Sequence, residues 1–243
     1  MAIAVDASTP ARATSSSQQN VTTATFSPPA NSLLVACTSA SAGSNSDPTV
    51  AITDNNGGFT WTQVGRASKT STSSTGISGG VASIHVASLA AGATNLTVTA
   101  TQTNGSSPTS LKIYVLTGAL LSGTNFDGST IGFSTANDTT TTAFTSTSTS
   151  SLFIVSATEW TAPGTAPTSS NTTYDAYTAS TSLDGLSGYR AITAIASQTA
   201  DLKCAGTSAA QWLYVTAEIL PALTGLPRPP VRVLQAVKRA STF

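Results

Sequence analysis

Few side chains in this chain of 243 residues could do acid–base or nucleophilic chemistry, and they are scattered. His85 is the only histidine, and it lies in the apolar run Ser83–Val86, where a strand is expected. A catalytic dyad needs a nucleophile and an orienting acid beside the imidazole. No Gly-x-Ser-x-Gly motif supplies that nucleophile. We therefore expect His85 to have a structural role.

The carboxylates show no catalytic pattern either. Glu159 and Glu218 are the only glutamates, and both end or flank expected strands. Hydrolysis of a glycoside needs two carboxylates that face each other across a cleft. Most aspartates fall in turn-like stretches, where Asp hydrogen-bonds its own backbone. The sequence thus predicts that the protein is not an enzyme, with no catalytic residue and no cofactor.

Metal-binding signals are also weak. Residues Asp54–Gly57 resemble the first half of a calcium loop, but the downstream bidentate acid is missing, so we expect a turn. Two cysteines and one histidine make a zinc site improbable. Cys37 and Cys204 both lie in strand-like runs, which predicts two buried thiols in preference to a disulfide. No metal site is predicted.

Three tryptophans could stack on sugar rings, although aromatic side chains more often serve a core. Trp61 and Trp212 lie inside strand-like runs and are expected in the core. Trp160 lies where a strand meets the loop Thr161–Gly164, so it is the candidate for contact with a glycan.

Composition indicates an ordered all-β protein. Hydrophobic residues make up 40% of the chain, which is enough to build a core, and short apolar runs alternate with Ser/Thr clusters. No segment of the body has a convincing 3.6-residue periodicity. No apolar run reaches the roughly 18 residues of a membrane-spanning helix. Met1–Asp6 is too short for the core of a signal peptide, so we expect synthesis in a cytoplasm without secretion.

One strand sequence occurs twice. Ser32–Cys37 recurs as Ser151–Ser156, and Ile113–Val115 is echoed by Leu213–Val215. Self-similarity in a fixed order marks a repeated supersecondary unit. We therefore predict a single jelly-roll-like β-sandwich with internal duplication over residues 20–220, preceded by an N-terminal strand and arm at 1–19. Its halves span 20–118 and 138–220, and two immunoglobulin-like domains remain the alternative.

Two details of this body are specific enough to test. Thr49–Thr53 and Phe59–Val64 flank the turn residues Asp54–Gly58, which predicts a β-hairpin. Gly118–Asn137 reads as a less regular connector between the halves.

Residues 221–243 form a different region. Pro221–Pro230 holds four prolines and should be extended, and the region carries four basic side chains and no acid. A basic arm on a mildly acidic body predicts docking on an acidic neighbour. Four charges are too few for a nucleic-acid site. The residues expected to bind a partner are Arg228, Arg232, Val233, Leu234, Val237, Lys238, Arg239 and Phe243.

Several stretches together resemble one family. These are the opening Ala2–Arg12, then Phe26–Val35, Phe59–Thr62, Ala217–Pro221 and the tail ending in Arg239–Ser241. They resemble accessory virion proteins of tailed phages of actinobacteria, which are usually described as minor tail or decoration-type proteins. The shared motifs are structural and include no catalytic residue.

The resemblance implies a non-enzymatic phage structural protein, either a minor tail or a capsid-decorating protein, located in the virion. It would attach to other virion proteins through its terminal arms, in many copies or as a homo-oligomer, without nucleic acid or membrane partners. The alternative function is a carbohydrate-binding module that contacts host surface glycans. Tail and capsid locations both remain open.

Overall fold

The computed structural model describes residues 2–42, 48–69, 79–103, 108–122, 125–136, 138–159, 166–179, 183–204 and 211–222. Within these ranges the chain forms strands and no helix, and no helix there could span a membrane. Every strand pair is antiparallel, so the expectation of an all-β protein is confirmed. The jelly-roll wiring of the strands stays a prediction.

The first main sheet belongs to the first half of the chain. Its strands lie in the order β1-β9-β4-β7-β6, and β2 also pairs with β9. The strands are β1 (Ala4–Val5), β2 (Ala13–Ser15), β4 (Ser32–Ala42), β6 (Thr62–Lys69), β7 (Gly79–Leu89) and β9 (Thr109–Thr117). The repeated sequence noted above therefore lies in β4, the strand that β7 and β9 flank.

The second main sheet has the same plan. Its order is β10-β18-β13-β15-β14, with the second copy of the repeated sequence in β13. The strands are β10 (Phe126–Ser134), β13 (Leu152–Glu159), β14 (Thr173–Ala179), β15 (Leu183–Ala191) and β18 (Trp212–Ile219). The strand order β18-β13-β15-β14 in the second main sheet corresponds to the order β9-β4-β7-β6 in the first. The two halves therefore share one topology, as an internal duplication predicts.

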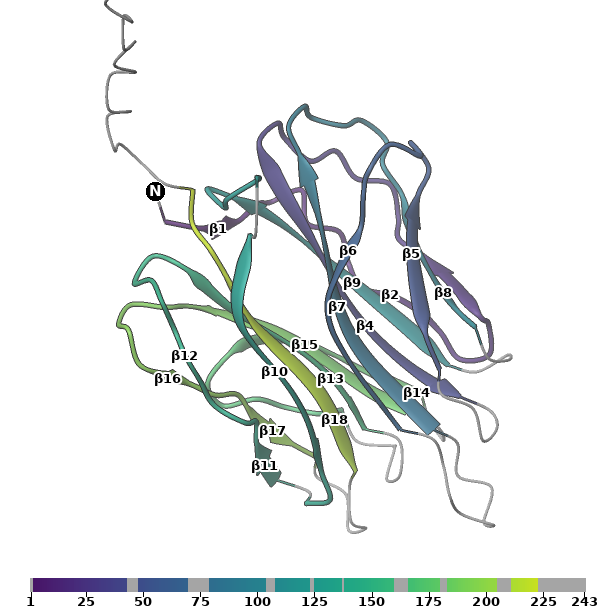
Figure 1. Ribbon diagram of the computed structural model, residues 1–243. Helices are drawn as coiled ribbons and strands as arrows, with labels where there is room; N and C mark the ends of the chain where they lie inside the picture. The colour runs from purple at the N-terminus through teal and green to yellow at the C-terminus, as the bar shows by residue number, and fades with distance from the viewer. Residues whose placement is uncertain are drawn as a thin grey trace, which may run out of the picture.

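Smaller sheets cover the outer faces of the two main sheets. The first main sheet carries β3 (Asn20–Thr22), β8 (Val98–Gln102) and β5 (Val50–Asp54), in the order β3-β8-β5. The second carries two pairs, β11 (Asp138–Thr140) with β17 (Asp201–Lys203), and β12 (Phe144–Thr145) with β16 (Ser197–Gln198). The result is four layers, with the two main sheets face to face in the middle (Figure 1).

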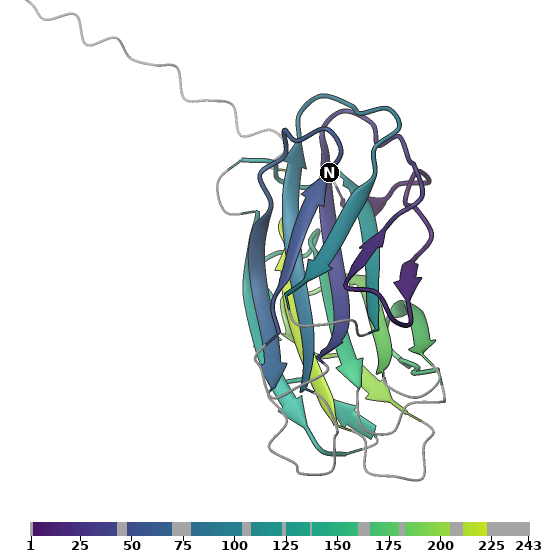
Figure 2. The same ribbon diagram turned by 90° about the vertical axis from the view of Figure 1, so that its right-hand side faces the viewer.

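The layers enclose three apolar cores. The central core joins the halves: Leu33, Val35 and Ile84 of the first main sheet lie in one cluster with Ile154 and Val215 of the second. Two further cores lie between each main sheet and its own outer strands. Because β4 contributes to two cores, its side chains are buried on both faces, as its nearly continuous apolar sequence requires. In the view of Figure 2 the strands of the main sheets run along the length of the molecule.

Matching hydrogen bonds support the duplication. The Thr23 hydroxyl accepts the Val98 N–H at 3.1 Å, and the Thr141 hydroxyl accepts the Ala200 N–H at 2.8 Å. The Ser32 and Ser151 hydroxyls, each at the start of a repeated strand, both donate to the carbonyl three residues earlier.

The register changes one detail of the predicted repeat. Ile113 lies opposite Ala36 in β4, and Thr216 lies opposite Val155, the counterpart of Ala36 in β13. Ile113 therefore corresponds to Thr216, and the echo with Leu213 is displaced along the strand.

Two other predictions about elements are wrong. The expected hairpin does form its turn, with Gly57 at φ +62°, but β5 pairs with β8 and β6 pairs with β7, in different sheets. The supposed irregular connector contains β10, the edge strand of the second main sheet. Glycines at 128 and 132 weakened the strand signal there.

Candidate functional site

The residues predicted to bind partners lie outside the described part of the chain. Trp160 falls in the undescribed stretch 160–165. The arm residues Arg228, Arg232, Val233, Leu234, Val237, Lys238, Arg239 and Phe243 fall in 223–243, which is also undescribed. Both assignments remain predictions.

His85 lies in the buried interior of β7, and 6% of its surface is exposed. Its Nδ1 is 3.4 Å from the Ser83 hydroxyl, which in turn lies 2.6 Å from the Thr38 hydroxyl. Burial lowers the pKa of His85 to about 4, so the imidazole is neutral at pH 7. This setting agrees with the structural role expected from the sequence.

The two glutamates lie far apart on neighbouring strands: Glu159 ends β13, and Glu218 lies in β18 opposite the start of β13. Glu159 pairs across the sheet with Trp212, whereas Glu218 pairs with Phe153. The Glu218 carboxylate accepts the N–H groups of Thr147 at 2.8 Å and of Ser148 at 3.0 Å, so it holds the turn that precedes β13. These two carboxylates therefore cannot act together on one glycosidic bond.

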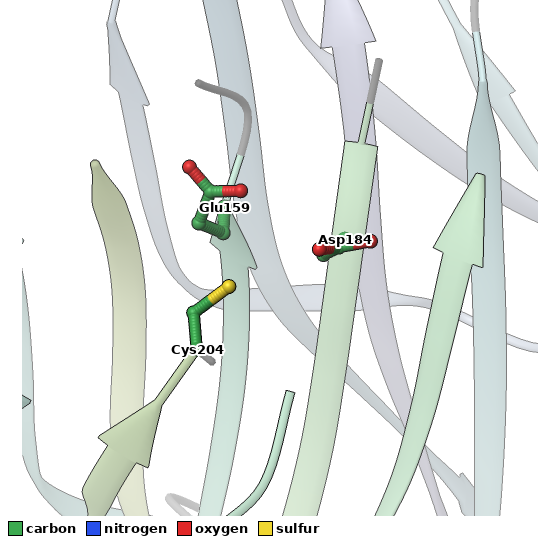
Figure 3. Close-up of side chains that lie close together, drawn as sticks. All are labelled: Glu159, Asp184 and Cys204. Atoms are coloured by element: carbon green, nitrogen blue, oxygen red, sulfur yellow. The ribbon is translucent and has the colours of Figure 1, made fainter. Parts of the chain in front are cut away.

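Sequence reasoning missed a cluster of three buried ionisable side chains. The register places Glu159 of β13 directly opposite Asp184 of β15, and Cys204 follows β17. One ligand atom from each lies within 4.8 Å of the others, and the three side chains lie close together in Figure 3. Glu159 and Asp184 are 0% exposed, and Cys204 is 3% exposed.

This cluster has a defined chemical capacity. Two carboxylates and a thiol are donors that a divalent ion such as Zn²⁺ accepts. The cluster lies in the core that also holds Trp212 and Leu186. The signal in the sequence was faint, because only the strand register brings residues 159, 184 and 204 together.

A second polar group joins the two halves, and we call it the polar clasp: Arg12, Ser110, Lys112, Asp175 and Ser187. Arg12 Nε donates to Asp175 Oδ1 at 2.9 Å, and its Nη2 donates to the Asp175 carbonyl at 2.6 Å and to the Ser187 hydroxyl. Arg12 Nη1 donates to the Ser110 hydroxyl at 3.0 Å. The guanidinium of Arg12 therefore hydrogen-bonds both to β9 of the first main sheet and to β14 and β15 of the second.

Lys112 completes the clasp. Its Nζ lies 3.1 Å from Asp175 Oδ2 and donates to the Pro10 carbonyl at 2.9 Å. Burial works to raise the pKa of Asp175, but the charge and hydrogen bonds of Arg12 and Lys112 outweigh it and hold that pKa below its usual value. The described N-terminal residues are thus bound to the body of the protein.

Both cysteines are buried and neither forms a disulfide, as predicted. Burial raises the pKa of the Cys37 thiol to about 12, with Arg12 and Lys112 acting in the opposite direction. Cys37 is therefore a thiol at neutral pH and a poor nucleophile.

Comparison with known proteins gives no further guide to the site, since no family model, curated protein or solved structure matches this chain.

Proposed function

We propose that the protein is a non-enzymatic structural component of a bacteriophage particle, a minor tail or capsid-decorating protein present in many copies. It attaches to other virion proteins, and the basic arm 221–243 is the main attachment. The resemblance of the sequence to accessory virion proteins supports this role, and one structural observation carries it further.

That observation is the fixed root of the arm. The Leu220 N–H donates to the Asn125 carbonyl at 3.0 Å, and the Leu120 N–H donates to the Leu220 carbonyl at 2.9 Å. The Ala222 N–H donates to the Gly118 carbonyl at 2.8 Å. These bonds hold the start of the arm against the connector between the halves. An arm with a rigid root loses less entropy when a partner orders it than one that leaves a loose terminus.

The body supports a structural role in a second way. The central core and the polar clasp join both halves into one unit. Charged side chains at the clasp and at Glu218 are engaged in holding the fold. Only 8% of all residues are charged, so the body offers contacts made mainly by Ser, Thr and backbone groups.

The experiment is a comparison of particle incorporation. A chain that ends after Ala222 keeps every described strand, so it should fold, with an unchanged thermal midpoint, and should fail to join particles. A full-length chain with Arg228, Arg232, Lys238 and Arg239 all changed to Gln tests the charge alone. Its incorporation should be weaker and should depend less on salt concentration, because the charges that salt would screen are gone. Normal incorporation of the truncated chain would refute attachment through the arm.

A further inference from the structure

The two sides of the sandwich differ in what covers them. On one side the N-terminal segment bridges β9 and β14 through the polar clasp, and the Tyr177 hydroxyl donates to the Ser15 carbonyl at 3.1 Å. On the other side lie β6 and β10, each the last strand of its sheet, in contact with each other. No described strand pairs with the outer edge of either one. We call this side, between β6 and β10, the open seam.

Two apolar side chains of β10 are exposed at the open seam. Ile131 is 54% exposed and Phe133 is 40% exposed, which few large hydrophobic side chains in the described residues equal. The register shows which way they face, because Ile131 lies opposite Val215 and Phe133 lies opposite Leu213, and both partners belong to the central core. The exposed pair therefore lies on the face of β10 turned towards the first main sheet, at the rim of the central core.

The backbone of β10 offers a second kind of contact. Its pairing with β18 is regular from Thr130 to Ser134, so alternate N–H and C=O groups there point away from β18, to an edge that no described strand occupies. An extended segment can add to such an edge, where main-chain bonds give affinity and alternate side chains give specificity. A segment that fits this edge needs two apolar side chains, two residues apart, to cover Ile131 and Phe133.

The neighbouring strand β6 leaves room for such side chains and adds one charge. Gly65 lies beside Ile131, and Lys69 Nζ lies 3.6 Å from the centroid of the Phe133 ring. At the far end, the seam is hollowed by a cavity of about 480 Å³ that Thr62 of β6 and Phe126 of β10 help to line. The two edges therefore do not close on each other along their whole length.

The C-terminal arm carries a matching segment. Val231 and Val233 are two residues apart, as Ile131 and Phe133 are, and Arg232 between them would face the opposite side of the added strand, away from β6. Charge also favours the body of this protein as the partner. Residues 223–243 hold four basic residues and no acid, whereas residues 1–222 hold ten acids and six basic residues. The mildly acidic body of another copy is thus a suitable neighbour for the basic arm.

The root of the arm directs it away from the open seam of its own copy. Strand β18 runs antiparallel to β10 and ends beside the start of β10. The chain then continues in the same direction, since the Ala222 N–H binds the Gly118 carbonyl (Figure 1). Its prolines favour an extended spacer, which would put Val231 about 28 Å beyond Ala222. The arm would have to turn back to reach its own β10, whereas it needs no reversal to reach a neighbouring copy.

We propose that residues 231–234 of one copy add as a strand to β10 in the open seam of a second copy, with Val231 and Val233 packed on Ile131 and Phe133. The inference rests on the proposed role of the arm as an attachment, and it names the partner as another copy of this chain. Each copy gives its arm and accepts the arm of another, so the contact can repeat from copy to copy.

Two complementary full-length variants test the proposal. Ile131→Lys puts a charge into the open seam and leaves the arm intact, whereas Val233→Asp changes the arm and leaves the seam intact. In sedimentation velocity the native chain should associate between about 1 and 100 µM, and each variant alone should associate about tenfold more weakly. An equimolar mixture of the two variants has one intact arm and one intact seam in each pair, so it should form a one-to-one complex and stop there.

A control and a competitor make the test specific. Ile195→Lys should associate as the native chain does, because Ile195 is 60% exposed and lies outside β6 and β10. A synthetic peptide of residues 223–243 should break up the native complexes without any change to the body. A native chain that stays monomeric, a mixture without a one-to-one complex, or complexes that survive both Ile131→Lys and the peptide would each overturn the proposal.

This proposal and the virion role fail separately. Incorporation into particles that depends on the arm, in a chain that does not associate with itself, would leave the virion role standing and remove this partner. Association of the chain with itself through the arm, together with normal incorporation of the chain that ends after Ala222, would do the reverse.

Discussion

Arg12 lies in the N-terminal segment and Asp175 lies in β14 of the second half, yet the guanidinium Nε is 2.9 Å from the carboxylate Oδ1. The Arg12 side chain is 6% exposed and the Asp175 side chain is 33% exposed, so water screens the pair only in part. The same guanidinium binds Ser110 and Ser187. The contact therefore links the N-terminal segment, the first main sheet and the second main sheet at one point.

Arg12→Met should destabilise the protein by about 2–3 kcal/mol, because it leaves Asp175 with Lys112 alone and removes the bonds to both serines. Urea unfolding measures the change. Arg12→Lys keeps the charge but loses the planar fork, so its loss should be smaller but still measurable. Equal stability of Arg12→Met and the native chain would show that the clasp adds nothing to the joining of the halves.

Glu218→Gln should destabilise the protein by about 1–3 kcal/mol. The two oxygens of the carboxylate accept the N–H groups of Thr147 and Ser148. Glutamine has only one oxygen, so its NH₂ would face one of these N–H groups and leave that N–H without an acceptor. Asp127→Asn is a suitable control, since Asp127 is exposed and accepts only the adjacent Gly128 N–H. Thermal unfolding of both variants compares them, and similar losses would contradict a special role for Glu218.

His85 should make the protein less stable as the pH falls from 7 to 4.5. The pKa of this imidazole is about 4 when folded, below its ordinary value of 6.5, so folding favours the neutral form. That stabilisation is complete above pH 6.5 and is lost as the pH falls towards 4. Across this window the loss should be about 2–3 kcal/mol.

The His85→Gln variant provides the comparison for the pH experiment, because glutamine does not titrate. Its stability should change much less between pH 7 and pH 4.5 when measured by urea unfolding. Asp175 does not confuse the result, because its lowered pKa confines its own loss of stabilisation to pH values below its ordinary 3.8. Parallel pH profiles for both proteins would exclude His85 as the cause.

Gly185→Ala should destabilise the contact between the main sheets by about 1–3 kcal/mol. A methyl group there would lie 2.8 Å from Ser39 Oγ and 2.9 Å from Ser39 Cβ. Gly58→Ala is the matched control, because its nearest neighbour, the Asn56 carbonyl oxygen, would be 3.9 Å away. Differential scanning calorimetry should show a clear loss for the first variant and almost none for the second.

The sequence predicted best those strands that are buried on both faces. The short apolar runs of β4, β13 and β18 predicted buried strands, and Trp212 of β18 is 0% exposed, as expected. The hairpin around Gly57 failed for a different reason. Turn residues fix the local change of direction, but the pairing of β5 with β8 depends on contacts distant in sequence.

The polar groups were harder to predict. Nothing in the sequence around Arg12 indicates that its partner is Asp175. Glu159 and Asp184 come together only because the strand register places them opposite each other. Such pairs emerge when sheets form and stack, so local patterns of charge do not reveal them. The arm and Trp160 stood out for the opposite reason, because composition and flanking residues mark them directly.

The route of the N-terminal segment constrains how the protein folds. Strand β1 pairs with β9, and Arg12 contacts Asp175, which lies 163 residues later, so Arg12 finds its partner only after β14 has been synthesised. Closing such long loops is slow in proteins dominated by non-local contacts. The sheets of the first half can form early, whereas the polar clasp forms only after β14, which contains Asp175, has been synthesised.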